Sequence, residues 1–342
     1  MNIRHFVKLC LALLCFHTGK AYCQDHEELF RKGIKLMQDS NYKAAIIAFD
    51  ESLVHSHRSA VTFFQRGTCY LMLNKPNVAL VDFNQALSID TNLSETYYNR
   101  ALAHQALNNY TFSEADFLIY RSKMPEDHRV LNNLALLMEE MGDYEQATYW
   151  YTQYLSFYPR NTETLKSRAL AYAEAKKTEK AIADIDLCYR IDPSDSSLWM
   201  LKGNIYYDAQ DYSQAIDAYN IILLNNPSHK EALTNRADAH TAGLKYEEAI
   251  ADYKRLSAGD KYNPEYYFNT GFCQLQLNRN EEAIRSFGNA LDTDYEALGL
   301  LLTLRGVAYN NLKMQMEACS DWQKAIEAGY KEADTYKKNY CQ

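Results

Sequence analysis

Small and bulky residues recur along this chain in a fixed order, with a period of 34 residues. Each period holds a Gly or Ala, a second small residue twelve places later and a large side chain four places after that. Residues four apart lie on one face of a helix, and small residues let two helices approach closely. The pattern therefore predicts pairs of antiparallel helices whose faces interlock. The first small positions are Gly33, Gly67, Ala101, Ala135, Ala169, Gly203, Ala237, Gly271 and Gly306.

Proline residues mark the same period, because Pro125, Pro159, Pro193 and Pro227 stand 34 residues apart. No single globular core requires such an interval, whereas a stack of equal repeats produces it. One helix pair cannot bury its outer face alone, so neighbouring pairs must supply the missing burial. We place nine repeats over 24–331 and a capping helix at 332–342. The repeats are 26–59, 60–93, 94–127, 128–161, 162–195, 196–229, 230–263, 264–298 and 299–331.

The sixth repeat carries the most complete motif, in the order Trp199, Gly203, Tyr206, Tyr212, Ala215, Tyr219 and Pro227. This layout resembles the tetratricopeptide repeat (TPR) family, over almost the whole chain after residue 23. The resemblance implies an all-α fold, a right-handed superhelical α-solenoid of nine helix–turn–helix repeats whose first helices line a concave groove. Tyr120 and Tyr154 stand where the family prefers Ala, so we expect looser packing around the third and fourth repeats.

An arginine precedes the first small residue in five repeats, and the same five repeats have an aspartate sixteen places later. The other four repeats lack both residues. Because the two places lie on facing helices, we predict a structural ion pair between the helices, bidentate where it is enclosed. The predicted pairs are Arg66–Asp82, Arg100–Asp116, Arg168–Asp184, Arg236–Asp252 and Arg305–Asp321.

The groove that the family geometry implies would be lined by the second, fifth, ninth and twelfth residues of each first helix. Its apolar ends suit aliphatic or aromatic anchors, and its Asn-rich middle suits the backbone amides of an extended segment or short helix. The alternative is that many of these side chains merely pack between repeats. The candidate groove residues are Phe30, Phe64, Tyr98, Asn132, Lys166, Asn204, Tyr207, Asp238, Phe268 and Phe272.

One known use of the family's groove is disfavoured. Family members that hold the acidic carboxyl terminus of heat-shock chaperones use a Lys and an Asn one helical turn apart, and basic residues in later repeats. Here Lys166 is followed one turn later by Leu170. The chain therefore departs from that pattern.

The first 23 residues have the layout of a secretory signal peptide. Arg4 and Lys8 precede an apolar run from Leu9 to Phe16, and Ala21 and Cys23 are small residues at the cleavage positions. The run is shorter than the roughly 20 residues that span a bilayer. We predict cleavage after Cys23, no stable membrane insertion, and a mature protein that is periplasmic or secreted. The alternative is an ordinary buried helix at the terminus.

Five cysteines follow the predicted cleavage site, and an oxidising compartment would permit a disulfide. The last repeat helix runs from Cys319 to a turn at Gly329, and a final helix returns to Cys341. The two runs have similar lengths, so the cysteines come level. We predict a Cys319–Cys341 bond that clamps the capping helix, with two unpaired thiols as the alternative.

Charge and motif content exclude several classes of function. The net charge is −8. Loss of the signal peptide removes three bases and no acid, which leaves 33 basic against 44 acidic residues, near −11. Such a chain repels a phosphate backbone, so no nucleic-acid partner is expected. We find no catalytic motif, phosphate-binding loop or zinc signature. His55 and His57 lack an evident third ligand, so neither a metal nor another cofactor is predicted.

These features predict a non-catalytic scaffold or adaptor for protein–protein interaction, binding a peptide or helix of a partner outside the cytoplasm. A holdase-type chaperone for exported or unfolded clients is the alternative. An enzyme is a distant third hypothesis, because too few residues lie outside the repeats to build a separate active domain. The partner and the oligomeric state are left open.

Overall fold

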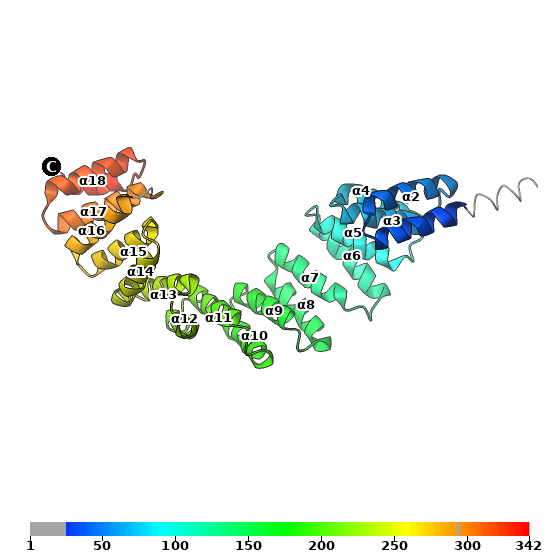
Figure 1. The fold of residues 1–342 in the computed structure, drawn as a ribbon, viewed down its shortest axis with the longest axis horizontal. Coiled ribbons are helices and arrows are strands. Elements are labelled where there is room, and N and C mark those ends of the chain that lie inside the picture. The colour runs from blue at the N-terminus through cyan, green and yellow to red at the C-terminus, as the bar shows by residue number, and fades with distance from the viewer. Residues whose placement is uncertain (1–24, 293–294, 342) are drawn as a thin grey trace, which may run out of the picture. The chain divides into compact units, whose positions relative to one another are not determined.

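The computed structural model describes residues 25–292 and 295–341, and every secondary-structure element in these ranges is a helix. Two compact bodies divide between Ala171 and Tyr172. Within each body, consecutive helices pack side by side (Figure 1). The predicted all-α fold of paired helices is confirmed. The signal peptide predicted at 1–23 lies outside the described residues.

In the amino-terminal body, a helix over 25–38 is followed by α2 and further pairs. The helices are α2 (Tyr42–His55), α3 (Ala60–Met72), α4 (Pro76–Ile89), α5 (Ser94–Gln105), α6 (Tyr110–Lys123), α7 (Arg129–Glu140), α8 (Tyr144–Phe157) and α9 (Thr162–Glu174), which contains the division.

The carboxy-terminal body continues the same alternation of first and second helices and ends with the capping helix. Its helices are α10 (Thr178–Ile191), α11 (Ser197–Asp208), α12 (Tyr212–Asn225), α13 (Lys230–Ala242), α14 (Tyr246–Gly259), α15 (Pro264–Gln276), α16 (Asn280–Leu291), α17 (Leu298–Asn311), α18 (Gln315–Glu327) and α19 (Ala333–Tyr340).

The turn inside each repeat has a residue in the left-handed backbone region. In the first repeat Ser40 has a φ of 57°, and the backbone N–H of Asn41 donates to the carbonyl of Leu36, which closes the helix end. The Asn41 side chain then accepts from the N–H of Ala44 and caps α2. Glycine suits this conformation best, yet only the fourth repeat uses one. The turn residues are Ser40, Asn74, Asn108, Gly142, Lys176, Gln210, Leu244, Asn278 and Lys313.

Close packing of the two helices explains the alternation of small and bulky residues. Gly67 faces Phe83, and a Cβ at residue 67 would lie 2.8 Å from the Phe83 ring. Ala79 on the second helix has no exposed surface, and neither has Phe83. The ring thus fills the space that the small residues open, as the sequence pattern predicts.

Bidentate ion pairs join the facing helices. The Arg66 Nε and Nη2 atoms donate to Asp82 at 2.9 and 2.7 Å, and Arg100 donates likewise to Asp116 at 2.7 and 2.7 Å. The pairs Arg236–Asp252 and Arg305–Asp321 have the same geometry. The aspartate side chains are only 4–5% exposed, so loss of either partner would leave a buried charge. Arg168 and Asp184 belong to different bodies, and their pairing stays a prediction.

The remaining guanidinium nitrogen extends the contact to the preceding repeat. Nη1 of Arg66 donates to Asp50, Nη1 of Arg100 to Asn84, and Nη1 of Arg236 to Asn220, each sixteen residues upstream. Arg168 donates to Thr152 and Lys202 to Asp186 over the same spacing. Arg66, Arg100 and Arg236 therefore each join the second helices of two successive repeats. We call this contact the inter-repeat bridge.

The capping helix α19 is held by aromatic packing and a disulfide. Cys319 and Cys341 are bonded, and they lie 22 residues apart in the chain. Trp322 has no exposed surface, and Tyr336 and Tyr340 pack against it at ring-centroid distances of 5.6 and 5.8 Å. The described cysteines Cys69, Cys188 and Cys273 are buried and carry no disulfide.

Candidate protein-interaction groove

The first helices carry the ten predicted groove residues, and most of these side chains are half buried. Residues at the fifth place of a first helix pack on the bulky residue nineteen places later. The ring centroids are 5.8 Å apart for Phe30–Phe49, 6.3 Å for Phe64–Phe83 and 5.8 Å for Phe268–Phe287. Each of these fifth-place rings therefore supports its own repeat with one face and offers only part of its surface to a partner.

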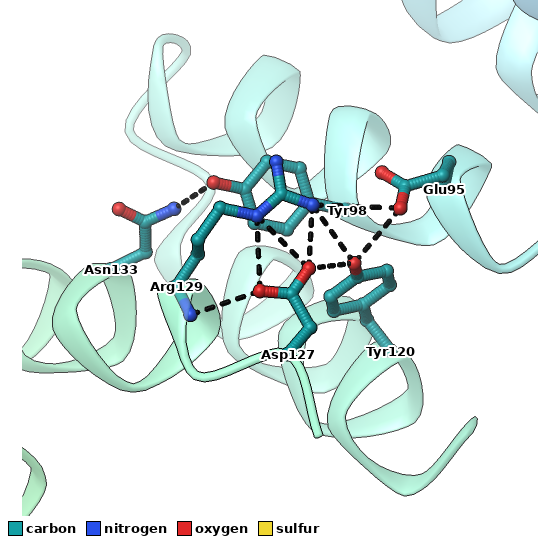
Figure 2. Close-up of polar contacts among 6 residues, drawn as sticks. All are labelled: Glu95, Tyr98, Tyr120, Asp127, Arg129 and Asn133. Carbon is teal, nitrogen blue, oxygen red and sulfur yellow. Dashed lines mark hydrogen bonds and ion pairs between the residues drawn. The ribbon is translucent and has the colours of Figure 1, made fainter. Parts of the chain in front are cut away.

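In the amino-terminal body the groove residue Tyr98 is part of a closed polar network (Figure 2). The Asn133 amide donates to the Tyr98 hydroxyl at 2.6 Å, and the Arg129 guanidinium lies 5.1 Å from the centre of the Tyr98 ring. Arg129 also donates to Asp127 at 2.5 and 2.9 Å. This network joins the third and fourth repeats, where Leu134 replaces the arginine of the inter-repeat bridge.

Tyr120, which stands where the family prefers Ala, completes this network. Its side chain is fully buried, and its hydroxyl lies 2.5 Å from Asp127 and 2.9 Å from Glu95 (Figure 2). Burial raises the pKa of Tyr120, and hydrogen bonds from Arg129 lower the pKa of Asp127. The charge of Arg129 is thus compensated by Asp127, and the larger ring is accommodated by hydrogen bonds within the interface.

Two other predicted residues of this body are also placed on first helices. The Asn132 carboxamide oxygen lies 3.4 Å from the Thr164 hydroxyl of the next repeat. Lys166 is half buried on α9. Of the predicted groove residues in this body, Tyr98 and Asn132 therefore make contacts between repeats, whereas Phe30 and Phe64 pack within their own repeats.

The carboxy-terminal body presents a polar cavity of about 270 Å³ between α11 and α13. Asn204 is one of its lining residues, and its carboxamide oxygen accepts from the Tyr219 hydroxyl at 2.8 Å and from the Asn235 amide at 3.0 Å. These two bonds fix the orientation of the Asn204 carboxamide. Its N–H₂ group has no described hydrogen-bond acceptor. The lining residues are Asn204, Tyr207, Asp208, Tyr219, Asn235 and Asp238.

An apolar cavity of about 400 Å³ adjoins the polar cavity, since Tyr207 and Asp238 line both. Its lining residues come from α11, α13, α14, α15 and α17, and Tyr253 of α14 is among them. The Tyr253 hydroxyl donates to Asp238 at 2.5 Å. Burial raises the pKa of Asp238, and the nearby charge of Glu265 adds to that effect. The other lining residues are Thr241, Ala242, Phe268, Asn269, Phe272, Leu300 and Leu304.

Five predicted groove residues thus line the two adjoining cavities: Asn204, Tyr207, Asp238, Phe268 and Phe272. Asn235, Asp208 and Leu304 also line the cavities and were missed from the sequence. A spacing of 31 residues could have predicted Asn235. This spacing relates the ninth residue of one first helix to the sixth residue of the next first helix, and these two residues face each other. Asn204–Asn235 and Thr68–Asn99 both make this contact, at 3.0 and 2.9 Å.

Metal and membrane chemistry find no support in the part of the chain that the structure describes. There, no cluster of three or more His, Cys, Asp or Glu side chains could hold a metal ion. No helix over 25–292 or 295–341 has the length and apolar character to cross a membrane.

Comparison with known proteins gives partial matches. A family model described as tetratricopeptide repeat matches residues 200–264 and 242–299. DnaJ homolog subfamily C member 7 of Mus musculus is 25% identical over 145 residues, which are 41% of this chain and 26% of the relative. Small glutamine-rich tetratricopeptide repeat-containing protein 2 of Mycosarcoma maydis is 29% identical over 107 residues, 30% of each chain. The chain therefore spans less than a third of these relatives' length.

Solved structures extend the likeness in fold. The carboxy-terminal part of a TPR repeat-containing protein from Cytophaga hutchinsonii aligns with a TM-score of 0.61 and 15% identity, over 70% of this chain and 98% of that chain. A chain of Naa15/Naa10 bound to HypK-THB aligns with a TM-score of 0.55 and 17% identity, over 87% of this chain and 51% of that chain. The described helices therefore share the paired-helix fold of these solved structures, and residues 200–299 match the tetratricopeptide repeat model.

Proposed function

We propose that this protein is a non-catalytic scaffold or adaptor that binds a segment of a partner protein in the groove of its carboxy-terminal body. The observation that carries the proposal is the pair of adjoining cavities, lined by first helices of four successive repeats. Their volumes suit side chains of a peptide, and half-buried Asn and Tyr groups are placed to hydrogen-bond a backbone.

The chemistry of the groove supports binding rather than catalysis. Asn204 and Asn235 bond to each other, and Asp238 accepts from Tyr253, so their orientations are fixed before a partner arrives. Preorganised polar groups reduce the entropy lost on association. The structural neighbour Naa15/Naa10 is bound to HypK-THB in its solved structure. A partner segment seated along the groove is the corresponding proposal for this chain.

We also propose that the protein acts outside the cytoplasm, as a periplasmic or secreted protein. The signal-peptide layout of residues 1–23 supports this location. The bonded cysteines Cys319 and Cys341 support it further, because disulfides persist in oxidising compartments. Amino-terminal sequencing of the exported protein should find Gln24 first. An uncut Met1 on the folded, exported chain would contradict the cleavage.

Site-specific photocrosslinking tests the scaffold proposal in cells that produce the full chain. A photoreactive phenylalanine replaces Phe272 in the apolar cavity, and a matched control carries it at Tyr262, which is 86% exposed and lines neither cavity. We expect one or a few adducts at residue 272 and none of these at residue 262. Identical adducts at both positions would contradict recognition by the groove.

A holdase-type chaperone is the second candidate, and the half-buried aromatic residues of the apolar cavity favour it. Its signature would be many unrelated adducts at residue 272 and slower aggregation of several unfolded clients. A scaffold would instead give the same few adducts when unfolded clients are added in excess.

A further inference from the structure

Charge on the groove-lining helices of the carboxy-terminal body is unevenly neutralised. Helices α11, α13, α15 and α17 contain four basic residues, and each is held by an aspartate outside these helices. The pairs are Lys202–Asp186 at 2.7 Å, Lys230–Asp260 at 3.2 Å, Arg236–Asp252 at 2.6 Å and Arg305–Asp321 at 2.7 Å.

The acidic residues of the same helices have no such partners. Asp208, Glu231, Asp238 and Glu265 make no ion pair with any basic side chain that the structure describes. Asp208 and Asp238 line the polar cavity, and Glu265 lies close enough to Asp238 to raise its pKa. Neither cavity is lined by Lys or Arg. The groove therefore keeps a negative charge that its own framework does not neutralise.

We infer that the two cavities together bind a segment of a partner protein in which a Lys or Arg side chain lies next to an aromatic or branched aliphatic one. This inference rests on the proposed function and specifies the chemistry of the partner. The basic group enters the polar cavity, and its apolar neighbour enters the apolar cavity.

Geometry in the polar cavity matches a basic side chain. Asp238 lines the cavity and uses its Oδ1 atom to accept from Tyr253, and no donor to its Oδ2 atom is described. Asp208 adds a second carboxylate, and the carboxamide oxygen of Asn235 adds a neutral acceptor. Carboxylates that accept from a cation form stronger hydrogen bonds than neutral pairs do. The Asn204 N–H₂ group is left to donate to a backbone carbonyl of the bound segment.

The adjoining apolar cavity explains why a basic residue alone does not suffice. Phe268, Phe272, Leu300 and Leu304 offer half-buried carbon surface from two successive first helices. Burial of an aromatic or aliphatic side chain there contributes binding energy, while the carboxylates select its neighbour. An acidic segment is repelled by the same groups. In the amino-terminal body the charge of Arg129 is neutralised by Asp127.

Fluorescence anisotropy with synthetic peptides tests the inference on the mature full chain. The probe is a short labelled peptide in which Lys and Phe alternate. Three matched peptides serve as comparisons. In the Glu peptide and the Gln peptide, that residue replaces every Lys, and in the Ser peptide Ser replaces every Phe. The protein variants are Asp208→Asn with Asp238→Asn, which preserve shape, and the control Asp217→Asn, an exposed acid on α12 that lines neither cavity.

We expect the Lys/Phe peptide to bind the wild type, and the double Asn variant to bind it at least about tenfold more weakly. The Asp217→Asn control should match the wild type, which excludes a general effect of net charge. The Gln and Ser peptides should each bind more weakly than the probe. Added salt should weaken binding of the Lys-containing probe more than binding of the Gln peptide.

Equal or tighter binding of the Glu peptide would overturn the inference, as would unchanged binding by the double Asn variant. The inference and the proposed function fail separately. Groove-specific adducts at residue 272 without binding of the Lys/Phe peptide would refute the basic partner and keep the scaffold. Absence of both would refute both. Circular dichroism of each variant confirms that a lost signal is not a lost fold.

Discussion

Asp238 is the residue at which stability and binding oppose each other. It is half buried, feels the charge of Glu265, and lines both cavities together with Tyr207. Burial raises its pKa, so ionisation of this carboxyl opposes folding. A residue that costs stability at neutral pH is better explained by a role in binding than by a role in packing.

The substitution Asp238→Asn should therefore raise the melting temperature at pH 7. Asn keeps an oxygen that can accept from Tyr253 but carries no buried charge. The folded-state pKa is raised, so the cost of the charge is present above that pKa and absent below the unfolded value of about 3.9. Thermal unfolding at several pH values measures this. The gain should vanish near pH 3, and a destabilised variant at pH 7 would contradict the interpretation.

Arg100 and Asp116 allow a test of the periodic ion pairs. Their side chains are 21% and 5% exposed, and two hydrogen bonds join them. A double-mutant cycle with Arg100→Met and Asp116→Asn should give a coupling energy of about 1–3 kcal/mol in urea unfolding. The exposed pair Lys338–Asp334, at 74% and 45%, should give less than about 0.5 kcal/mol in the same cycle. Additive effects at Arg100 and Asp116 would show that the bonds contribute nothing specific.

At this scale the sequence predicts what recurs and misses what occurs once. The Arg–Asp pairs could be predicted because each repeats at the same two places in five repeats. The bonds among Tyr120, Asp127 and Arg129 occur at a single junction, so no second copy marks them. Asn235 could not be predicted from the periodic pattern, because its partner Asn204 lies in the preceding repeat and this pattern relates residues of one repeat to each other.

The helix pair is the element whose form follows most directly from the sequence. Spacing between small and bulky residues determines which faces meet, so the predicted antiparallel pairs could be derived without further information. The turn between the helices also recurs, but its residue type does not. Eight of the described turns place a non-glycine residue at positive φ, which is unfavourable for a side chain with a Cβ atom.

Leu244 offers a test of the turn. Its φ is 61° and its side chain is 71% exposed, so Leu244→Gly removes backbone strain and loses little packing. We expect a gain of about 0.5–1 kcal/mol in the free energy of unfolding. Gly142, at a φ of 75° in the corresponding turn, is the matched reverse case. Gly142→Ala should lose a similar amount although no atom lies within 4 Å of the added Cβ. A lower free energy of unfolding for Leu244→Gly would show that packing of the leucine side chain contributes more than the backbone strain costs.

On the scale of the whole molecule, stability is distributed among neighbouring repeats, and the last repeat needs a separate covering element. Helix α19 has that role, because it covers Trp322 where a further repeat would otherwise pack. Both the helix and its bond to Cys319 could be predicted, because the lengths of the two final segments bring the cysteines level. The side-chain contacts of Trp322 with Tyr336 and Tyr340 could not, since nothing in the periodic pattern continues past the ninth repeat.

Removal of the bond between Cys319 and Cys341 should loosen α19 before it affects the remaining repeats. The bond closes a segment of 22 residues, for which loop entropy predicts about 3 kcal/mol. In Cys319→Ser with Cys341→Ser we expect a red shift in Trp322 emission, because Tyr336 and Tyr340 no longer cover the ring. Hydrogen exchange should accelerate in α19 and α18 first. Uniform acceleration over the described helices would contradict a local role.

The inter-repeat bridge has a mechanical consequence at the carboxy-terminal end. Thr270 stands at the bridging position of the eighth repeat, and Arg305 of the ninth bonds only to Asp321 among the described residues. Among the described residues, no half-buried arginine of the bridging position therefore joins the eighth repeat to the seventh or to the ninth. That repeat supplies Phe268 and Phe272, so this part of the apolar cavity is held by hydrophobic packing and by the exposed Arg279–Glu247 pair rather than by an inter-repeat bridge.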